Sequence, residues 1–197
     1  MQRIIFSLVV ATAIAISTVV VTSCGNAQAQ EGTVLNLQVM EKFLFQLNVN
    51  PCHAQPIVEM AGSPSDYFEA NQEQLSDYDI FDLSENMYLL YLVSILEENK
   101  IMTTVDWKEE YSEVLYALNE LSGIKFENID ENNYEHSTAG EILSVLNRQV
   151  ENKTDKTIFC IDTDSDSYSF GLIEKNKLQE LKKTGEDLKI KVYQPKE

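Results

Sequence analysis

Apolar residues recur at helical spacing through the first two thirds of the chain. A helical face in 33–51 is formed by Leu37, Met40, Phe43, Leu44 and Leu47. The Val and Phe content of that stretch also suits a strand, but the spacing favours a helix. Between 51 and 83, prolines and Gly62 interrupt any sustained period, which predicts irregular structure or short helices.

Three later segments carry helix start signals. Asp82 with Glu85 forms the spacing of a capping box before a helix that runs to about Glu98, whose centre, Tyr88 to Leu96, is apolar nearly all round and predicts a buried core helix. The same spacing recurs at Asp106 and Glu109, before a helix that Gly123 would end, and at Thr138 and Glu141, before "GEILSVLNRQV". We therefore expect three capped helices between 82 and 150.

The last third of the chain changes period. "IMTTVD" is already strand-like, "TIFCI" and "SYSFGLI" predict two strands, and "DLKIKVY" alternates like a third. A short helix in "NKLQELKKTG" would end at Gly185. The prediction is a single α+β domain over 33–197, in which N-terminal helices precede a β-β-α-β unit.

The first thirty residues have the pattern of an export signal. Arg3 precedes an apolar run from Ile4 to Val21. The following "VTSC" resembles the lipobox of bacterial lipoproteins, which implies that 1–23 is a signal peptide, that Cys24 becomes lipid-modified, and that 24–32 is a flexible tether. Cleavage after 29, at "AQA", with soluble secretion is one alternative, and an uncleaved membrane anchor is another. We expect a lipid-anchored envelope protein facing the periplasm.

The charge of the chain limits its partners. Among 197 residues there are 15 Lys plus Arg against 32 Asp plus Glu, a formal net charge of -17. Removal of the leader takes away Arg3 and no acid, so the mature domain is more acidic still. A nucleic-acid backbone would be repelled, and nucleic-acid binding is not expected.

Catalytic and cofactor motifs are missing from the sequence. The two histidines, His53 and His136, fall in segments without a nucleophile motif or paired zinc-ligand spacing, and no phosphate-binding glycine loop occurs. We predict no cofactor and no catalysis. Cys52 and Cys160 both survive export and could form a disulfide, although Cys160 lies in an apolar run that equally suits a buried free thiol.

The acidic segment "IDTDSDSYSF" raises the question of a cation site. Asp162, Asp164 and Asp166 have EF-hand spacing, but the sixth position is Ser167 and the twelfth is Ile173, so the calcium-binding pattern fails. The main interpretation is a hairpin turn stabilised by Asp and Ser side chains. A looser cation site, or acids used in recognition or catalysis, stays open.

Trp107 is the only tryptophan. Its ring either packs on the core, the commoner case, or serves as an anchor for a partner. Together, "DWK" and the late "DSDSY" resemble motifs of small uncharacterised bacterial domains, some of which are similar to α+β proteins of toxin-immunity systems. The resemblance covers about the last 120 residues of the chain. It matches at Asp106, Trp107, Lys108, Asp164, Asp166 and Tyr168.

The functional prediction is a module that binds a protein or peptide without catalysis, in the manner of an immunity or inhibitor protein. The alternative is a protein or hydrolase that depends on a divalent cation held by Asp162, Asp164 and Asp166. No motif in the sequence identifies a substrate or a partner.

Overall fold

The computed structural model describes residues 36–84, 87–127 and 134–195. The signal peptide, Cys24 and the tether lie outside these residues. Residues 32–197 form one compact unit. In the described part of the chain, no helix combines the length and the apolar character needed to cross a bilayer.

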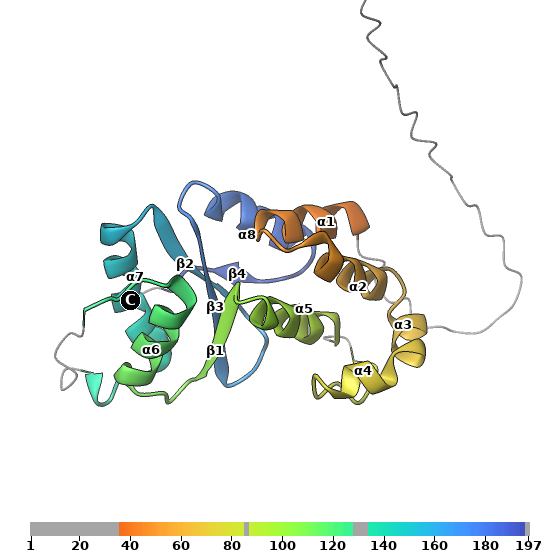
Figure 1. Cartoon of the computed structure of the whole chain (residues 1–197), viewed down its shortest axis with the longest axis horizontal. Helices are drawn as coiled ribbons and strands as arrows, with labels where there is room; N and C mark the ends of the chain where they lie inside the picture. Colours follow the sequence, from red (N-terminus) through yellow and green to blue (C-terminus); the bar gives the residue numbers. More distant parts are fainter. Residues whose placement is uncertain (1–35, 85–86, 128–133, 196–197) are drawn as a thin grey trace, which may run out of the picture. The chain divides into compact units, whose positions relative to one another are not determined.

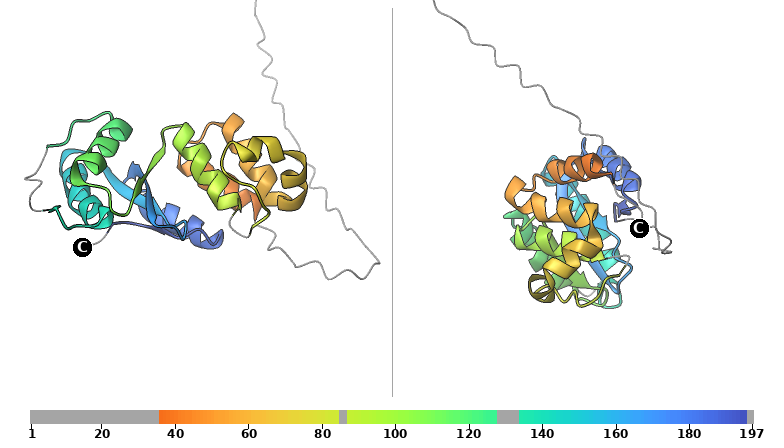
Figure 2. Two further views of the ribbon diagram at one scale, coloured as in Figure 1. Left: turned by 90° about the horizontal axis from the view of Figure 1, so that it is seen from below. Right: turned by 90° about the vertical axis from the view of Figure 1, so that its right-hand side faces the viewer.

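Helices cover both faces of an antiparallel sheet (Figures 1 and 2). The strands are β1 (Met102–Asp106), β2 (Lys156–Ile161), β3 (Ser167–Glu174) and β4 (Val192–Tyr193), in the spatial order β1-β3-β2-β4. The helices are α1 (Leu37–Gln46), α2 (Pro51–Gly62), α3 (Pro64–Ala70), α4 (Gln72–Ser76), α5 (Met87–Glu98), α6 (Tyr111–Ser122), α7 (Ala139–Lys153) and α8 (Leu178–Asp187). The predicted α+β class is confirmed.

The side chains of β2 alternate between two separate clusters of buried residues. Phe159 and Ile161 join α1, α2, α5 and α8 in what we call the large core, while Ile158 and Cys160 join α6 and α7 in the small core. Because both faces of this strand are covered, its sequence is a continuous apolar run rather than an alternation. The sheet is thus a partition between two cores.

The large core surrounds α5, the predicted core helix. Its members from this helix are Met87, Leu89, Tyr91, Leu92, Val93, Ile95 and Leu96. The expected helix in 33–51 is present as α1, which buries Met40, Phe43 and Leu44. The predicted capping box of Asp82 includes Glu85, which lies outside the described residues.

Gly171 and Phe159 fit together on the large-core side of the sheet. They are direct partners in the β2–β3 ladder. A Cβ at residue 171 would lie 2.6 Å from the Phe159 ring and 2.7 Å from the Ile101 carbonyl oxygen. The glycine therefore provides the space into which the aromatic ring packs.

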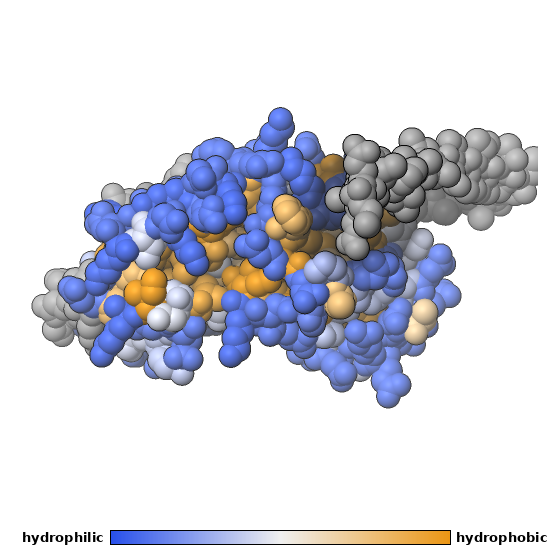
Figure 3. Space-filling model, turned by 45° about the horizontal axis from the view of Figure 1, so that its top comes forward, coloured by the Kyte–Doolittle hydropathy of each residue, from blue (hydrophilic) through white to orange (hydrophobic). Residues whose placement is uncertain are grey.

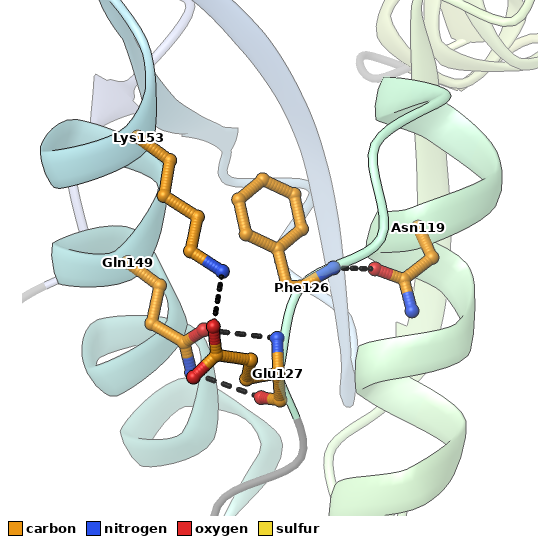
Figure 4. A network of polar contacts seen from close by, with 5 residues as sticks. All are labelled: Asn119, Phe126, Glu127, Gln149 and Lys153. Carbon is orange, nitrogen blue, oxygen red and sulfur yellow. Dashed lines mark hydrogen bonds and ion pairs between the residues drawn. The ribbon is translucent and has the colours of Figure 1, made fainter.

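The small core is closed by α6 and α7, and Phe126 and Glu127, which follow α6, contact both helices (Figure 4). Phe126 N donates to Asn119 Oδ1 on α6 at 2.8 Å. Glu127 exchanges backbone hydrogen bonds with the Gln149 amide on α7 and pairs with Lys153 at 3.1 Å. The two helices are thereby fixed to each other at the point where the chain leaves α6.

Three boundary predictions were wrong for identifiable reasons. Asp106 does not cap a helix: its carboxylate accepts from Lys108 N at 2.9 Å in a local turn, and α6 begins only at Tyr111. Gly185 does not end α8, which continues to Asp187; a Cβ there would lie 2.7 Å from Ile190 O, so close packing requires the glycine. The alternation of "DLKIKVY" reflects burial of Leu188 and Ile190 in a turn, and the strand is only β4.

The surface is largely polar, and the face shown in Figure 3 has a band of apolar residues between hydrophilic margins. Large apolar side chains that are exposed lie on several different elements. They are Leu37, Phe45, Phe81, Leu83, Leu90, Trp107, Tyr116 and Ile124. Single exposed side chains of this kind are normal on soluble proteins, so they do not by themselves identify a binding surface.

Candidate functional site

The three aspartates form the turn between β2 and β3. Asp162 Oδ1 accepts a hydrogen bond from Asp164 N at 3.1 Å, and Asp164 adopts a left-handed conformation with φ of 54°. Hydroxyl groups of Thr163, Ser165 and Ser167 follow one another at 2.7 Å. This is the hairpin turn predicted as the main interpretation.

The carboxylates of this turn do not converge on one point. No cluster of three or more His, Cys, Asp or Glu side chains that could hold a metal ion occurs in the described ranges. Asp162 instead forms an ion pair with Lys191, whose Nζ lies 2.5 Å from the Oδ2 atom of Asp162. The structure offers no support for the cation-site alternative.

The Asp162–Lys191 pair joins the hairpin turn to β4. The hydrogen bond from Lys191 holds the pKa of Asp162 below its usual value, and Asp162 in turn raises the pKa of Lys191. The side chain of Asp162 is 27% exposed and that of Lys191 is 73% exposed. Solvent screening at this exposure keeps the contribution of the pair to stability small.

The segment Asp106–Lys108 lies beside the same turn. Trp107 N donates to Asp166 O at 3.0 Å, and Trp107 O accepts from Ala139 N, the first residue of α7, also at 3.0 Å. The backbone of Trp107 thus connects the turn to the start of α7. Its ring is not packed in the core as expected: it is 40% exposed, with Lys108 Nζ at 4.6 Å from its centroid.

The start of α7 has the predicted capping box. Glu141 N donates to Thr138 Oγ1 at 3.3 Å, and Glu141 Oε2 accepts from Thr138 N at 2.7 Å. Gly140 follows the cap directly. A Cβ at this position would come within 2.5 Å of the Tyr168 hydroxyl oxygen, so the glycine lets the phenol of β3 lie against the helix.

A cavity of about 520 Å³ lies between these elements. Its lining residues come from the start of α7, the β2–β3 hairpin and the β4 segment. They are Thr138, Gly140, Glu141, Cys160, Asp162, Tyr168, Lys191, Tyr193, Gln194 and Pro195. We call the region formed by Asp106–Lys108, Thr138–Glu141, Asp162–Asp166 and Lys191–Pro195 the sheet-end site.

Cys160 lines the cavity as a protonated thiol. Burial raises its pKa to about 12, and a hydrogen bond from the Tyr193 hydroxyl opposes this only in part. Burial also raises the pKa of Tyr193. At neutral pH the thiol is therefore a poor nucleophile. Cys160 is buried, Cys52 is exposed on α2, and both are free, so the disulfide considered from the sequence is not formed.

Gln194 is held at the back of the β4 segment. Its amide donates to Glu151 Oε1 and to Thr157 Oγ1, both at 2.8 Å. Thr157 also bonds to Asn147, whose Oδ1 accepts from Ile158 N at 2.7 Å. The wall of the cavity that β4 supplies is therefore anchored to α7 and β2.

The comparisons with known proteins add one finding about the chain. Residues 43–196 match the family described as Domain of unknown function (DUF6630). The chain belongs to this family. Comparison with curated proteins and with solved structures finds no significant match. The matched range of the DUF6630 domain contains every residue of the sheet-end site.

Some of the residues singled out from the sequence lie in this candidate site. Asp162 and Tyr168 line the cavity, and Asp106, Trp107, Lys108, Asp164 and Asp166 lie around the same end of the sheet. Sequence reasoning missed Lys191, Tyr193 and Gln194. The alternation of apolar and polar residues in 187–193 was the sequence signal available for this segment. It does not reveal that β4 pairs with β2 beside the hairpin turn.

Proposed function

We propose that the DUF6630 domain binds a basic segment of a protein or peptide at the sheet-end site, without catalysis. The observation that carries this proposal is the cavity at one end of the sheet, which two tyrosines and two carboxylates line, with the exposed Trp107 on the adjoining segment. The protonated thiol and the splayed aspartates provide no nucleophile and no metal centre in the described residues. Binding is the chemistry that these side chains support.

The net charge of the domain favours a cationic partner. The net charge of -17 repels anionic surfaces and attracts cationic ones. The sheet-end site contains two lysines, Lys108 and Lys191, and five acids, which are Asp106, Glu141, Asp162, Asp164 and Asp166. Such complementarity speeds association and makes it sensitive to salt.

The aromatic residues supply the contact area. Trp107 is 40% exposed, and Tyr168 and Tyr193 are partly buried at the margin of the small core. Tyrosine and tryptophan dominate the energetics of protein interfaces because they bury large areas at little cost in conformational entropy. These rings are the anchors expected for a bound segment.

The single tryptophan allows a direct test. Octalysine peptide added to the protein at low ionic strength should change Trp107 emission, and the apparent affinity should fall steeply as salt rises. Octaglutamate is the matched control and should leave the emission unchanged. Calorimetry on Trp107→Ala, compared with Tyr116→Ala on α6, separates loss of the anchor from loss of any exposed aromatic ring. Absence of octalysine binding would overturn the proposal.

We further propose that the domain is lipid-anchored through Cys24 in a bacterial envelope. Support comes from the resemblance of "VTSC" to a lipobox and from the tether-like 24–32. Several acyl chains hold a domain stably on a bilayer, whereas one chain binds it marginally. Mass analysis of the mature N-terminus should find acylated Cys24; an unmodified chain that starts at Gln30 would contradict the anchor.

A further inference from the structure

A cation of the chain itself, the ammonium group of Lys191, lies at the opening of the cavity. Lys191 Nζ contacts Asp162 Oδ2 and lies 5.9 Å from the centroid of the Tyr193 ring. An ammonium group beside a carboxylate and over an aromatic ring is a favourable arrangement for a cation. The ammonium group of Lys191 thus occupies a place at the opening of the cavity that suits a cation.

The contacts of the Lys191 side chain are weak enough for another cation to replace its ammonium group beside Asp162. Its side chain is 73% exposed, and such a pair contributes little because solvent screens it. Lys191 and Asp162 also remain joined through the backbone, since Asp162 N donates to Lys191 O at 3.0 Å. The side chain can therefore leave the carboxylate while β4 keeps its place.

The other lining groups favour a cation over an anion. Glu141 and Asp162 are carboxylates, and Lys191 is the only cation among the residues that line the cavity. The capping box engages Glu141 Oε2, while Oε1 accepts no hydrogen bond within the described ranges. The positive end of the α7 dipole opposes a cation, but Glu141 in its first turn offsets that field.

The dimensions of the cavity suit one long side chain. About 520 Å³ falls within the range of small-ligand pockets, roughly 300–1,000 Å³. The rings of Tyr168 and Tyr193 can pack on an aliphatic stem while the charged end meets the carboxylates. A whole folded element would not enter such a space.

We propose that the cavity accepts one lysine or arginine side chain of the bound basic segment, which displaces Lys191 from Asp162. This inference rests on the proposed function and specifies the chemical group that the site recognises. Lys191 then acts as an internal competitor. Its removal should strengthen binding, whereas loss of Asp162 should weaken it.

The test measures octalysine affinity by calorimetry for wild type and four variants. Lys191→Ala should bind about threefold more tightly, because the screened internal pair that it removes is weak, and Asp162→Asn should bind about tenfold more weakly, as expected for a lost charged hydrogen bond. Lys183→Ala on α8 and Glu73→Gln on α4 are matched controls with the same changes in net charge away from the cavity. Urea denaturation of each variant verifies that the fold is intact.

The outcomes separate this inference from the proposed function. If octalysine binds wild type but Lys191→Ala equals Lys183→Ala, or Asp162→Asn equals Glu73→Gln, the cavity does not receive the side chain and only the broader function survives. If octalysine does not bind wild type, both fail. Gly140→Ala supplies a charge-neutral check: its methyl group should displace the Tyr168 phenol and weaken binding without any change in salt dependence.

Discussion

The large core and the small core share one sheet but differ in how completely they cover it. In the large core, α1, α2, α5 and α8 surround the β2 side chains, and α5 alone buries seven residues. In the small core, α6 and α7 pack on β1, β2 and β3, while β4 packs against α8 on the other side. The cavity lies at the margin of the small core, beside β4.

The two cores also differ in where their polar groups lie. In the large core, the Tyr91 hydroxyl meets Tyr67 at 3.3 Å and Gln74 at 3.2 Å. At the margin of the small core, polar groups instead line an accessible space. The candidate site lies at this margin, between the start of α7, the β2–β3 hairpin and the β4 segment.

The largest expected effect compares one phenylalanine from each core. Phe159→Ala and Phe170→Ala both remove a fully buried ring, so each should lower the free energy of unfolding by about 3–5 kcal/mol. Urea denaturation measures both losses. Octalysine affinity should change only for Phe170→Ala, because Phe170 neighbours Tyr168 in the small core; an equal change in both variants would break the comparison.

Gly171 and Gly140, two of the close-packed glycines, give the next effect. Gly171→Ala places a methyl group against the Phe159 ring and a backbone oxygen, and should cost about 1–3 kcal/mol of stability. Gly140→Ala meets only the outer end of Tyr168, which can move into the cavity, and should cost less. Thermal denaturation of the pair tests this order. A larger loss for Gly140→Ala would show that the Tyr168 contact is structural.

The α7 cap should have a moderate effect. Thr138→Ala removes the acceptor for Glu141 N, and should lower stability by about 1 kcal/mol. Thr138→Ser keeps the hydroxyl and is the matched control. Denaturation midpoints in urea measure the difference. Equal loss in both variants would mean that the methyl group, rather than the cap, stabilises the helix.

The smallest effect concerns the Asp162–Lys191 pair and depends on pH. Because the pKa of Asp162 is lower in the folded state, the pair stabilises the protein above the unfolded carboxyl pKa of about 3.9. That contribution disappears as pH falls through the lower folded value. Asp162→Asn should lower stability slightly at pH 7, and by less at pH 2, where protonation of the wild-type carboxyl weakens the pair. Urea denaturation at both pH values measures the difference; a constant difference would assign the effect to the turn backbone.

Prediction succeeded for elements governed by local interactions. The capping box at Thr138, the left-handed Gly123 that ends α6, and the apolar α5 all depend on residues within a few positions of one another. The Asp106 spacing matched the same rule, yet failed there. A competing local turn to Lys108, together with the hydrogen bond from Trp107 to Asp166, holds the backbone out of the helix until Tyr111.

The sequence by itself determined the α+β class, the order of the main elements and the acidic character that limits the partner. These follow from periodicity, capping and charge, which are properties of neighbouring residues or of the whole composition. Only the tertiary structure brought Gly140, Asp162, Tyr168, Lys191 and Tyr193 around one cavity. That arrangement depends on β4 pairing with β2 and on α7 packing over the hairpin, contacts between distant segments that no local pattern encodes.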